Sequence, residues 1–400
     1  MLNYLYLYGI VWSITLILYS FGWSDYCIPL ATEIKVFLII SIAISFILGY
    51  IFRKKFIFKR IDKFPKRTSI ITIGVVLFAF LEYIVCHQIP LIGIITGSNA
   101  YTSFDGIPTL HVINSTIASF YSQYLFYLFL CFKNKKKLLI EYASLLIFVH
   151  LFEFNRGGLL ISVFISAILY FSSIAHKIKF KHILFGTVFL IVVLYIFGGL
   201  GNIRETGSWN ADYLGIYGGF NSKFPSWLPN QFKWPYLYMV CSLWNLTYIL
   251  NQISIDFVGF VSTFLPDFIT KRIMPSFGSK DAINLLVISF TTYSGYGTTL
   301  LYGGIAGMYV KFAFLMGING IILKVVSKDK RFFVPTAGII AAIVTMFFFT
   351  NTISYSAISF PIVYPFIISI LRKKESKKYE RYSFSGRIRN KALSANISNK

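Results

Sequence analysis

Apolar segments close to the length of a membrane-spanning helix recur from one end of this 400-residue chain to the other. About 20 consecutive apolar residues form a helix that can cross a bilayer, and a single soluble core has no room for so many of them. Only 13% of the residues are charged, about half the share found in soluble domains. We therefore expect an all-α polytopic membrane protein with about ten transmembrane helices. The predicted spans are 3–21, 33–52, 69–95, 108–132, 138–154, 157–175, 183–200, 298–324, 332–351 and 354–371.

Basic residues gather in a few short connections between these apolar segments. The chain has 38 Lys and Arg residues against 15 Asp and Glu, a net charge of +23. Most of the basic residues lie in 53–67, 133–137, 176–182, 324–331 and 372–400. Such connections are retained on the cytoplasmic side, whereas a nucleic-acid-binding protein gathers its basic residues on one folded surface. We expect a multi-pass membrane protein with both termini cytoplasmic and no nucleic-acid partner.

The segment 201–297 is the longest connection and is expected to be external, between spans 7 and 8. It mixes aromatic residues, glycines, prolines and charges, and its apolar part contains polar residues such as Asp256. This composition favours short interfacial or re-entrant helices over a plain spanning helix. Two further spans within 236–292, about twelve in total, are the alternative. The domain organisation predicted is one transmembrane domain, 1–371, including this loop, followed by a basic cytoplasmic tail, 372–400.

Some basic residues lie on the expected external side, where the topology gives no reason for them. A guanidinium group can bind two phosphate oxygens at once, so these residues predict a cationic ring around an external cavity. Arg156 lies in the short turn 155–156, three residues after Glu153. For Arg156 the alternative role is anchoring at the membrane interface. The residues are Arg156, Arg204, Lys271 and Arg272.

Glu82, Lys311, His87 and His111 are ionisable residues within predicted spans. Charges near the bilayer centre are costly and normally paired, so we expect a salt bridge between Glu82 and Lys311, with a proton or ion pathway as the functional alternative. His87 and His111 have no Asp or second His at helical spacing. Their surroundings favour hydrogen-bonded core or interfacial histidines over a catalytic base. No HExxH, P-loop, CxxC or Asp-rich motif is present, so we expect no metal and no cofactor.

Several features of the layout occur together. They are ten or more spans, the turn Arg156-Gly157-Gly158, and a large external loop that begins with Asn202-Ile203-Arg204-Glu205. The loop contains the aromatic-rich stretch YLYMVCSLWNLTYIL, and the Gly-rich stretch YSGYGTTLLYGG follows from Tyr293. In these features the chain resembles the bacterial oligosaccharide repeat-unit polymerases, the O-antigen or capsule polymerase family.

The resemblance implies a metal-independent membrane glycosyltransferase that acts on the external face of the bacterial cytoplasmic (inner) membrane. Such an enzyme transfers a growing glycan from one polyprenyl diphosphate to the terminal sugar of another lipid-linked repeat unit. The expected partners are the polyprenyl-diphosphate-linked oligosaccharide donor and acceptor, the lipid bilayer and a chain-length regulator protein.

The resemblance also implies roles for particular residues. Fixed arginines would stabilise the departing diphosphate, and a nearby carboxylate would accept the proton of the attacking sugar hydroxyl. The expected catalytic residues are Glu205, Asp212, Arg156 and Arg204. The expected substrate-binding residues are Arg272, Lys271, Glu153, Trp209, Tyr213 and Tyr293.

Two other functional classes remain open. A lipid-linked oligosaccharide flippase or other transporter would have inward-facing cavity charges and repeat symmetry, and no internal repeat is visible. A polysaccharide O-acyltransferase would have a catalytic His and a cytoplasmic site for an acyl donor. The related glycan ligases share the predicted layout and differ in their acceptor.

Overall fold

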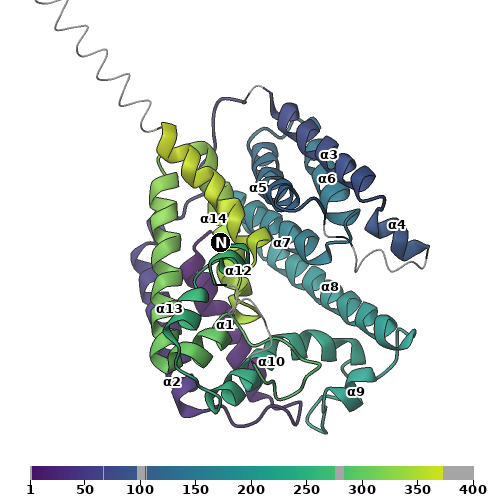
Figure 1. The fold of residues 1–400 in the computed structure, drawn as a ribbon, viewed down its shortest axis with the longest axis vertical. Helices are drawn as coiled ribbons and strands as arrows, with labels where there is room; N and C mark the ends of the chain where they lie inside the picture. The colour runs from purple at the N-terminus through teal and green to yellow at the C-terminus, as the bar shows by residue number, and fades with distance from the viewer. Residues whose placement is uncertain (1, 66, 97–103, 105, 275–282, 373–400) are drawn as a thin grey trace, which may run out of the picture.

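The computed structural model describes residues 2–65, 67–96, 104, 106–274 and 283–372. Throughout these residues the regular elements are helices, and the β-type pairing described is limited to two isolated bridges. The all-helical class expected from the sequence is therefore confirmed for this part of the chain (Figure 1).

Five helices are long and apolar enough to cross a membrane. They are α2 (Thr32–Ile51), α3 (Thr68–Val85), α8 (Phe180–Thr206), α13 (Gly297–Val326) and the segment Lys330–Phe348, which joins α14 (Lys330–Thr345) to η8 (Met346–Phe348). Shorter apolar helices are α1 (Tyr4–Ser20), most of α7 (Arg156–Ser173) and Ser356–Arg372, which begins with α15 (Ser356–Ser359) and η9 (Phe360–Ile362).

Helix α14 is the centre of the bundle. It packs against α1, α7, α13 and α5 (Leu110–Cys131), and nearly all of its side chains are buried. Small residues allow this close approach. At Gly338, for example, a Cβ atom would lie 2.8 Å from Cδ2 of Leu169 in α7. The helix buried on all sides is thus built from residues that neighbouring helices can approach.

Helix α5 is long enough to span a bilayer but carries several polar side chains on its buried surface. These groups bond to neighbouring helices: Gln123 donates to the carbonyl of Ser162 and accepts from the hydroxyl of Ser166. Interhelical hydrogen bonds of this kind hold membrane helices together. The lower hydropathy of α5 therefore fits a helix surrounded by protein.

Two predicted spans are irregular in the structure. The predicted span 69–95 is divided into α3 and α4 (Pro90–Ile95), with His87 at φ 52° between them. In the predicted span 138–154, α6 (Lys137–Leu145) continues directly into the π-helical η3 (Leu146–Leu151). Helix α4 begins at Pro90. A proline has no backbone N–H to donate inside a helix, and it disfavours the helical conformation of the residue before it. Glu82 consequently lies in the last turn of α3 and not at the middle of a span.

The predicted span 183–200 begins earlier and ends later than expected. Helix α8 runs to Thr206 and ends at Gly207, whose φ of +74° is the left-handed conformation that terminates many helices. Arg204 and Glu205 therefore lie in the last helical turn. The predicted span 183–200 had left Arg204 and Glu205 in the loop after the helix.

The rest of 201–297 contains one longer helix and several short ones. Helix α10 packs against α1, α8 and α13 and is largely buried. The elements are α9 (Tyr213–Tyr217), η5 (Asn230–Phe232), α10 (Lys233–Leu250), α11 (Phe257–Ser262) and α12 (Asp267–Ile273). Short helices were expected in this segment and are present. The short connections η1 (Arg53–Lys55) and η4 (Ala175–Lys177) lie in two of the basic segments.

Helix α13 is interrupted near its start. Gly304 has φ +61° and ψ −163°, which breaks the helical ladder. The carbonyls of Leu301 and Tyr302 accept hydrogen bonds from the backbone N–H groups of Ser254 and Asp256. Irregular backbone inside a membrane protein needs such partners. The segment before α11 is thereby tied to the interruption in α13.

Candidate functional site

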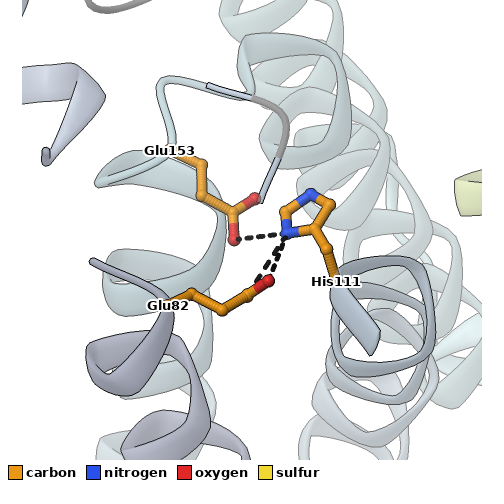
Figure 2. Close-up of side chains that lie close together, drawn as sticks. All are labelled: Glu82, His111 and Glu153. Atoms are coloured by element: carbon orange, nitrogen blue, oxygen red, sulfur yellow. Dashed lines mark hydrogen bonds and ion pairs between the residues drawn. The ribbon is translucent and has the colours of Figure 1, made fainter. Parts of the chain in front are cut away.

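Three ionisable side chains from distant parts of the sequence meet beside the first turn of α5 (Figure 2). Glu82 comes from α3, His111 from α5, and Glu153 from the turn between η3 and α7. Nδ1 of His111 lies 3.3 Å from each carboxylate oxygen of Glu82 and 4.0 Å from Oε1 of Glu153. One potential ligand atom from each residue lies within 4.8 Å of the others. We call these residues the Glu-His-Glu cluster.

The cluster is largely shielded from solvent. Glu82 is 0% exposed and Glu153 is 8% exposed, whereas the side chain of His111 is 24% exposed. Oε1 of Glu82 also accepts a hydrogen bond from the backbone N–H of Ile107 at 3.0 Å. Oε1 of Glu153 has no hydrogen-bond partner among the described residues. Two buried carboxylates therefore face a single imidazole nitrogen.

Local backbone conformations explain how these residues meet. Gly106 has φ +64°, and a Cβ atom there would lie 2.7 Å from Cγ of His111. Only glycine lets the backbone lie this close to the ring in that conformation. Thr109, at φ 69°, then begins α5. On the other side, Phe154 at φ 55° makes the turn that carries Glu153.

Arg272, one of the predicted cations, contacts the segment that carries His111. Nη2 of Arg272, in the last turn of α12, donates to Oγ1 of Thr109 at 3.1 Å, and Thr109 precedes His111 by two residues. Lys271 beside it is exposed. Arg156 begins α7, three residues after Glu153, and its side chain lies outside the described part of the structure. The structure thus brings Glu153, Arg272 and the backbone of Arg156 to the same helix ends.

A second group of predicted residues lies at the C-terminal end of α8. Nε of Arg204 donates to Oε1 of Glu205 at 2.7 Å, and its guanidinium carbon lies 5.5 Å from the ring centre of Trp234. Tyr213 stacks on the same Trp234 ring, with centroids 6.2 Å apart and planes at 6°. Arg204 and Tyr213 therefore share one aromatic surface.

Asp212 belongs to this second group. Its carboxylate accepts hydrogen bonds from Nζ of the buried Lys233 at 2.6 and 2.7 Å and from the backbone N–H of Gly215 at 3.0 Å. The last of these caps α9. Asp212 and Lys233 line a polar cavity of about 290 Å³. Further lining residues are Phe220, Asn221, Phe224 and Asn230.

The remaining predicted residues are Trp209 and Tyr293, and both are packed against other parts of the protein. Trp209 donates from Nε1 to the hydroxyl of Tyr195 at 3.3 Å and packs so closely on Gly199 that a Cβ there would lie 2.3 Å from its ring. Trp209 thus ties the loop to α8. Tyr293 precedes α13, and burial raises its pKa to about 12, so its hydroxyl stays protonated at neutral pH.

The predicted cationic ring is divided between these two groups. Figure 1 shows α9 and α12, which belong to the two groups, in different parts of the molecule. The predicted salt bridge between Glu82 and Lys311 is wrong. Nζ of Lys311 instead donates to the carbonyl of Thr263 and lies 4.5 Å from the ring centre of Phe264.

His111 was interpreted from sequence as a core or interfacial histidine, and its contact with Glu82 was missed. Helical spacing cannot detect it because the partners lie on different helices. The sequence feature that could have predicted this contact is the position of the three residues along their predicted spans. All three residues of the Glu-His-Glu cluster lie near helix ends that face away from the basic connections 53–67, 133–137 and 176–182.

Chemically, the two groups differ. The Glu-His-Glu cluster combines two carboxylates and an imidazole, which are groups that hold protons or metal ions. The Asp212 cavity combines a carboxylate, an ammonium group, amides and aromatic rings, which suits a polar organic ligand. Comparison of the chain with protein-family models, with curated proteins and with solved structures found no match.

Proposed function

We propose that the protein is a metal-independent membrane glycosyltransferase that polymerises polyprenyl-diphosphate-linked oligosaccharide repeat units on the external face of the bacterial cytoplasmic membrane. The chain would cross the membrane about ten times with both termini inside. In this orientation the basic segments 53–67, 133–137, 176–182 and 324–331 are cytoplasmic. The Arg204 end of α8 and the Glu-His-Glu cluster then face the external side.

The observation that supports this function most is the linked set of groups around Asp212. Arg204 and Tyr213 lie on Trp234, and Lys233, next to Trp234 in sequence, pairs with Asp212 in the wall of the cavity. Ligand pockets for larger molecules measure roughly 300–1,000 Å³, so a cavity of about 290 Å³ suits a single sugar ring. A carboxylate and an amide can orient sugar hydroxyls, while Phe220 and Phe224 offer apolar faces.

The reaction needs two kinds of group. A hydroxyl of the acceptor sugar attacks the anomeric carbon of the donor, the bond to the diphosphate oxygen breaks, and the hydroxyl proton is accepted by a carboxylate. Asp212 and Glu205 remain the candidates for that acceptor. Each already holds a cation, Lys233 or Arg204, so the sugar hydroxyl must share or replace that contact.

Charge on the departing diphosphate must also be stabilised. Arg204 offers a half-exposed guanidinium group at the end of α8, and Arg272 offers an exposed one at the end of α12. We assign the departing diphosphate to Arg204, which lies beside the Asp212 cavity. Arg272 and Arg156 lie with the Glu-His-Glu cluster and would bind a phosphate group there. Arginine is preferred over lysine for such binding because its planar group contacts two oxygens at once.

The test uses cells lacking the gene and complemented with the wild type or with Asp212→Asn. Loss of polymer with accumulation of single lipid-linked repeats on the external face is the expected result. Accumulation on the cytoplasmic face would indicate a flippase, and full-length polymer without acyl groups would indicate an acyltransferase. Either of these outcomes contradicts the proposal.

A further inference from the structure

One carboxylate oxygen of the Glu-His-Glu cluster has no hydrogen-bond partner among the described residues. Glu82 and Glu153 both face Nδ1 of His111, which can donate only one proton. Oε1 of Glu153 is buried and is the oxygen without a partner. A buried polar group without a partner is unfavourable. A cation held between the three side chains would supply that partner.

We propose that the cluster binds one divalent transition-metal ion, Zn²⁺ or Mn²⁺, between Nδ1 of His111 and the carboxylates of Glu82 and Glu153. A neutral imidazole presents a lone pair on Nδ1, and the two carboxylates carry a charge of −2 that a divalent ion balances. Imidazole suits zinc and carboxylates suit manganese among the common ions. A mixed set of one nitrogen and two oxygen ligands is therefore compatible with either.

The distances fit such an ion. Zinc lies about 2.0–2.2 Å from nitrogen and oxygen ligands, so two ligand atoms on a tetrahedral ion are roughly 3.4 Å apart by that geometry. Nδ1 of His111 is 3.3 Å from the Glu82 carboxylate. The corresponding separation from Glu153 is 4.0 Å, which a small side-chain rotation would shorten. Figure 2 shows all three groups directed toward the space between them.

The surroundings of the cluster also resemble the support that metal ligands need. Groups behind the ligands fix their orientation. The backbone N–H of Ile107 holds Oε1 of Glu82, and Gly106 lies against the His111 ring. Phe104 contacts the same ring edge-on, with centroids 5.7 Å apart. Three protein ligands would leave one coordination position for water.

The proposed ion would join α3, α5 and the turn before α7. Its role in this proposal is structural, because it would hold the ends of these helices where Arg156 and Arg272 lie. The inference does not depend on glycosyl transfer. Metal binding is measured on the purified protein without any glycan substrate, so a failure of either proposal leaves the other intact.

The experiment uses full-length protein in detergent after removal of any affinity tag. The protein is stripped with a chelator, dialysed and titrated with Zn²⁺ or Mn²⁺, and bound metal is measured by mass spectrometry together with the unfolding temperature. We expect about one ion per chain and a higher unfolding temperature in its presence, since a ligand that binds only the folded state stabilises it.

The isosteric variants Glu82→Gln and Glu153→Gln should each weaken binding at least about tenfold, as changes at metal sites commonly do. Glu33→Gln, at an exposed position in the first turn of α2, is the matched control and should bind as the wild type does. Arg156→Gln tests whether the Arg156 side chain is the missing partner of Glu153, and it should bind the metal with the same stoichiometry as the wild type. Wild-type protein that binds no stoichiometric Zn²⁺ or Mn²⁺, binding that survives Glu153→Gln, or binding that appears only in Arg156→Gln would overturn the proposal.

Discussion

His111 and Glu82 lie 29 positions apart on different helices, and the imidazole Nδ1 is 3.3 Å from the carboxylate. The contact depends on the backbone between them. Residues 106–109 turn twice through left-handed conformations before α5 begins, and the same segment supplies the Ile107 N–H that holds Glu82. The position of His111 is therefore set by a loop as much as by its own helix.

The first prediction tests this loop through Gly106→Ala. The variant should be destabilised both by its positive φ, at about 1–2 kcal/mol, and by a Cβ placed 2.7 Å from Cγ of His111, which adds about 1–3 kcal/mol as other overpacked sites do. Gly207→Ala is the control, because Gly207 also has a positive φ but nothing within 4 Å of the added atom. Thermal unfolding in detergent should show a larger loss for Gly106→Ala. Equal losses would mean that contact with His111 contributes nothing.

The second prediction concerns orientation in the membrane. Reporter fusions at residues 60, 135, 179 and 328 should be cytoplasmic, and a fusion at 220 should be external, because the basic connections are retained inside. Alkaline phosphatase activity and fluorescence of a cytoplasmic reporter measure the two states. An external signal at residue 60 would invert the orientation and move the Asp212 cavity to the cytoplasmic side.

The third prediction concerns Arg204. Arg204→Lys keeps the charge but loses the planar group that lies on Trp234 and bonds to Glu205. Polymerisation of purified lipid-linked repeats should fall at least about tenfold, since removal of one donor to a developing anion commonly costs 10²–10³ in rate. Lys223→Arg, an exposed change elsewhere in the same loop, should leave the rate unchanged. A wild-type rate in Arg204→Lys would exclude a role of its guanidinium in diphosphate binding.

Much of the helical architecture could be predicted because it depends on local apolar composition. The apolar run 332–351 corresponds closely to Lys330–Phe348, and the extra length of α8 follows from Gly207, a residue visible in the sequence. The break after α3 was missed because the residues between Val85 and Pro90 are mostly apolar or neutral. Hydropathy records composition and gives no weight to Pro90, the residue at which α4 begins.

The predicted sites were harder to recognise because their contacts are long-range. Asp212 was chosen for its place in the loop, but its partner Lys233 lies 21 positions away. Lys311 was paired with Glu82 because both are charged residues in apolar segments. In the structure Lys311 instead bonds to the carbonyl of Thr263, the C-cap residue of α11. Carbonyls at the end of a helix have no donor within the helix, and the N–H of Asp267, which would be that donor in a continued helix, donates to Ser354. A neutral backbone group thus replaced the expected carboxylate.

The last prediction separates the two candidate proton acceptors. Asp212→Asn removes the charge, while the Asn side chain can still cap α9. If Asp212 accepts the proton of the attacking hydroxyl, the rate of polymerisation in vitro should fall by roughly a hundred- to ten-thousandfold.

Loss of the ion pair with Lys233 is a competing explanation, so Lys233→Met is the matched variant. It breaks the same contact, 2.6 Å in the wild type, but keeps the carboxylate. We expect Lys233→Met to retain a higher rate at saturating substrate than Asp212→Asn even if substrate binds more weakly, because the proton acceptor is still present. Glu205→Gln in the same assay should then have a smaller effect than Asp212→Asn. If Glu205→Gln instead abolishes the reaction while Asp212→Asn keeps the wild-type rate, the proton acceptor is at the end of α8, and the Asp212 cavity only positions the sugar.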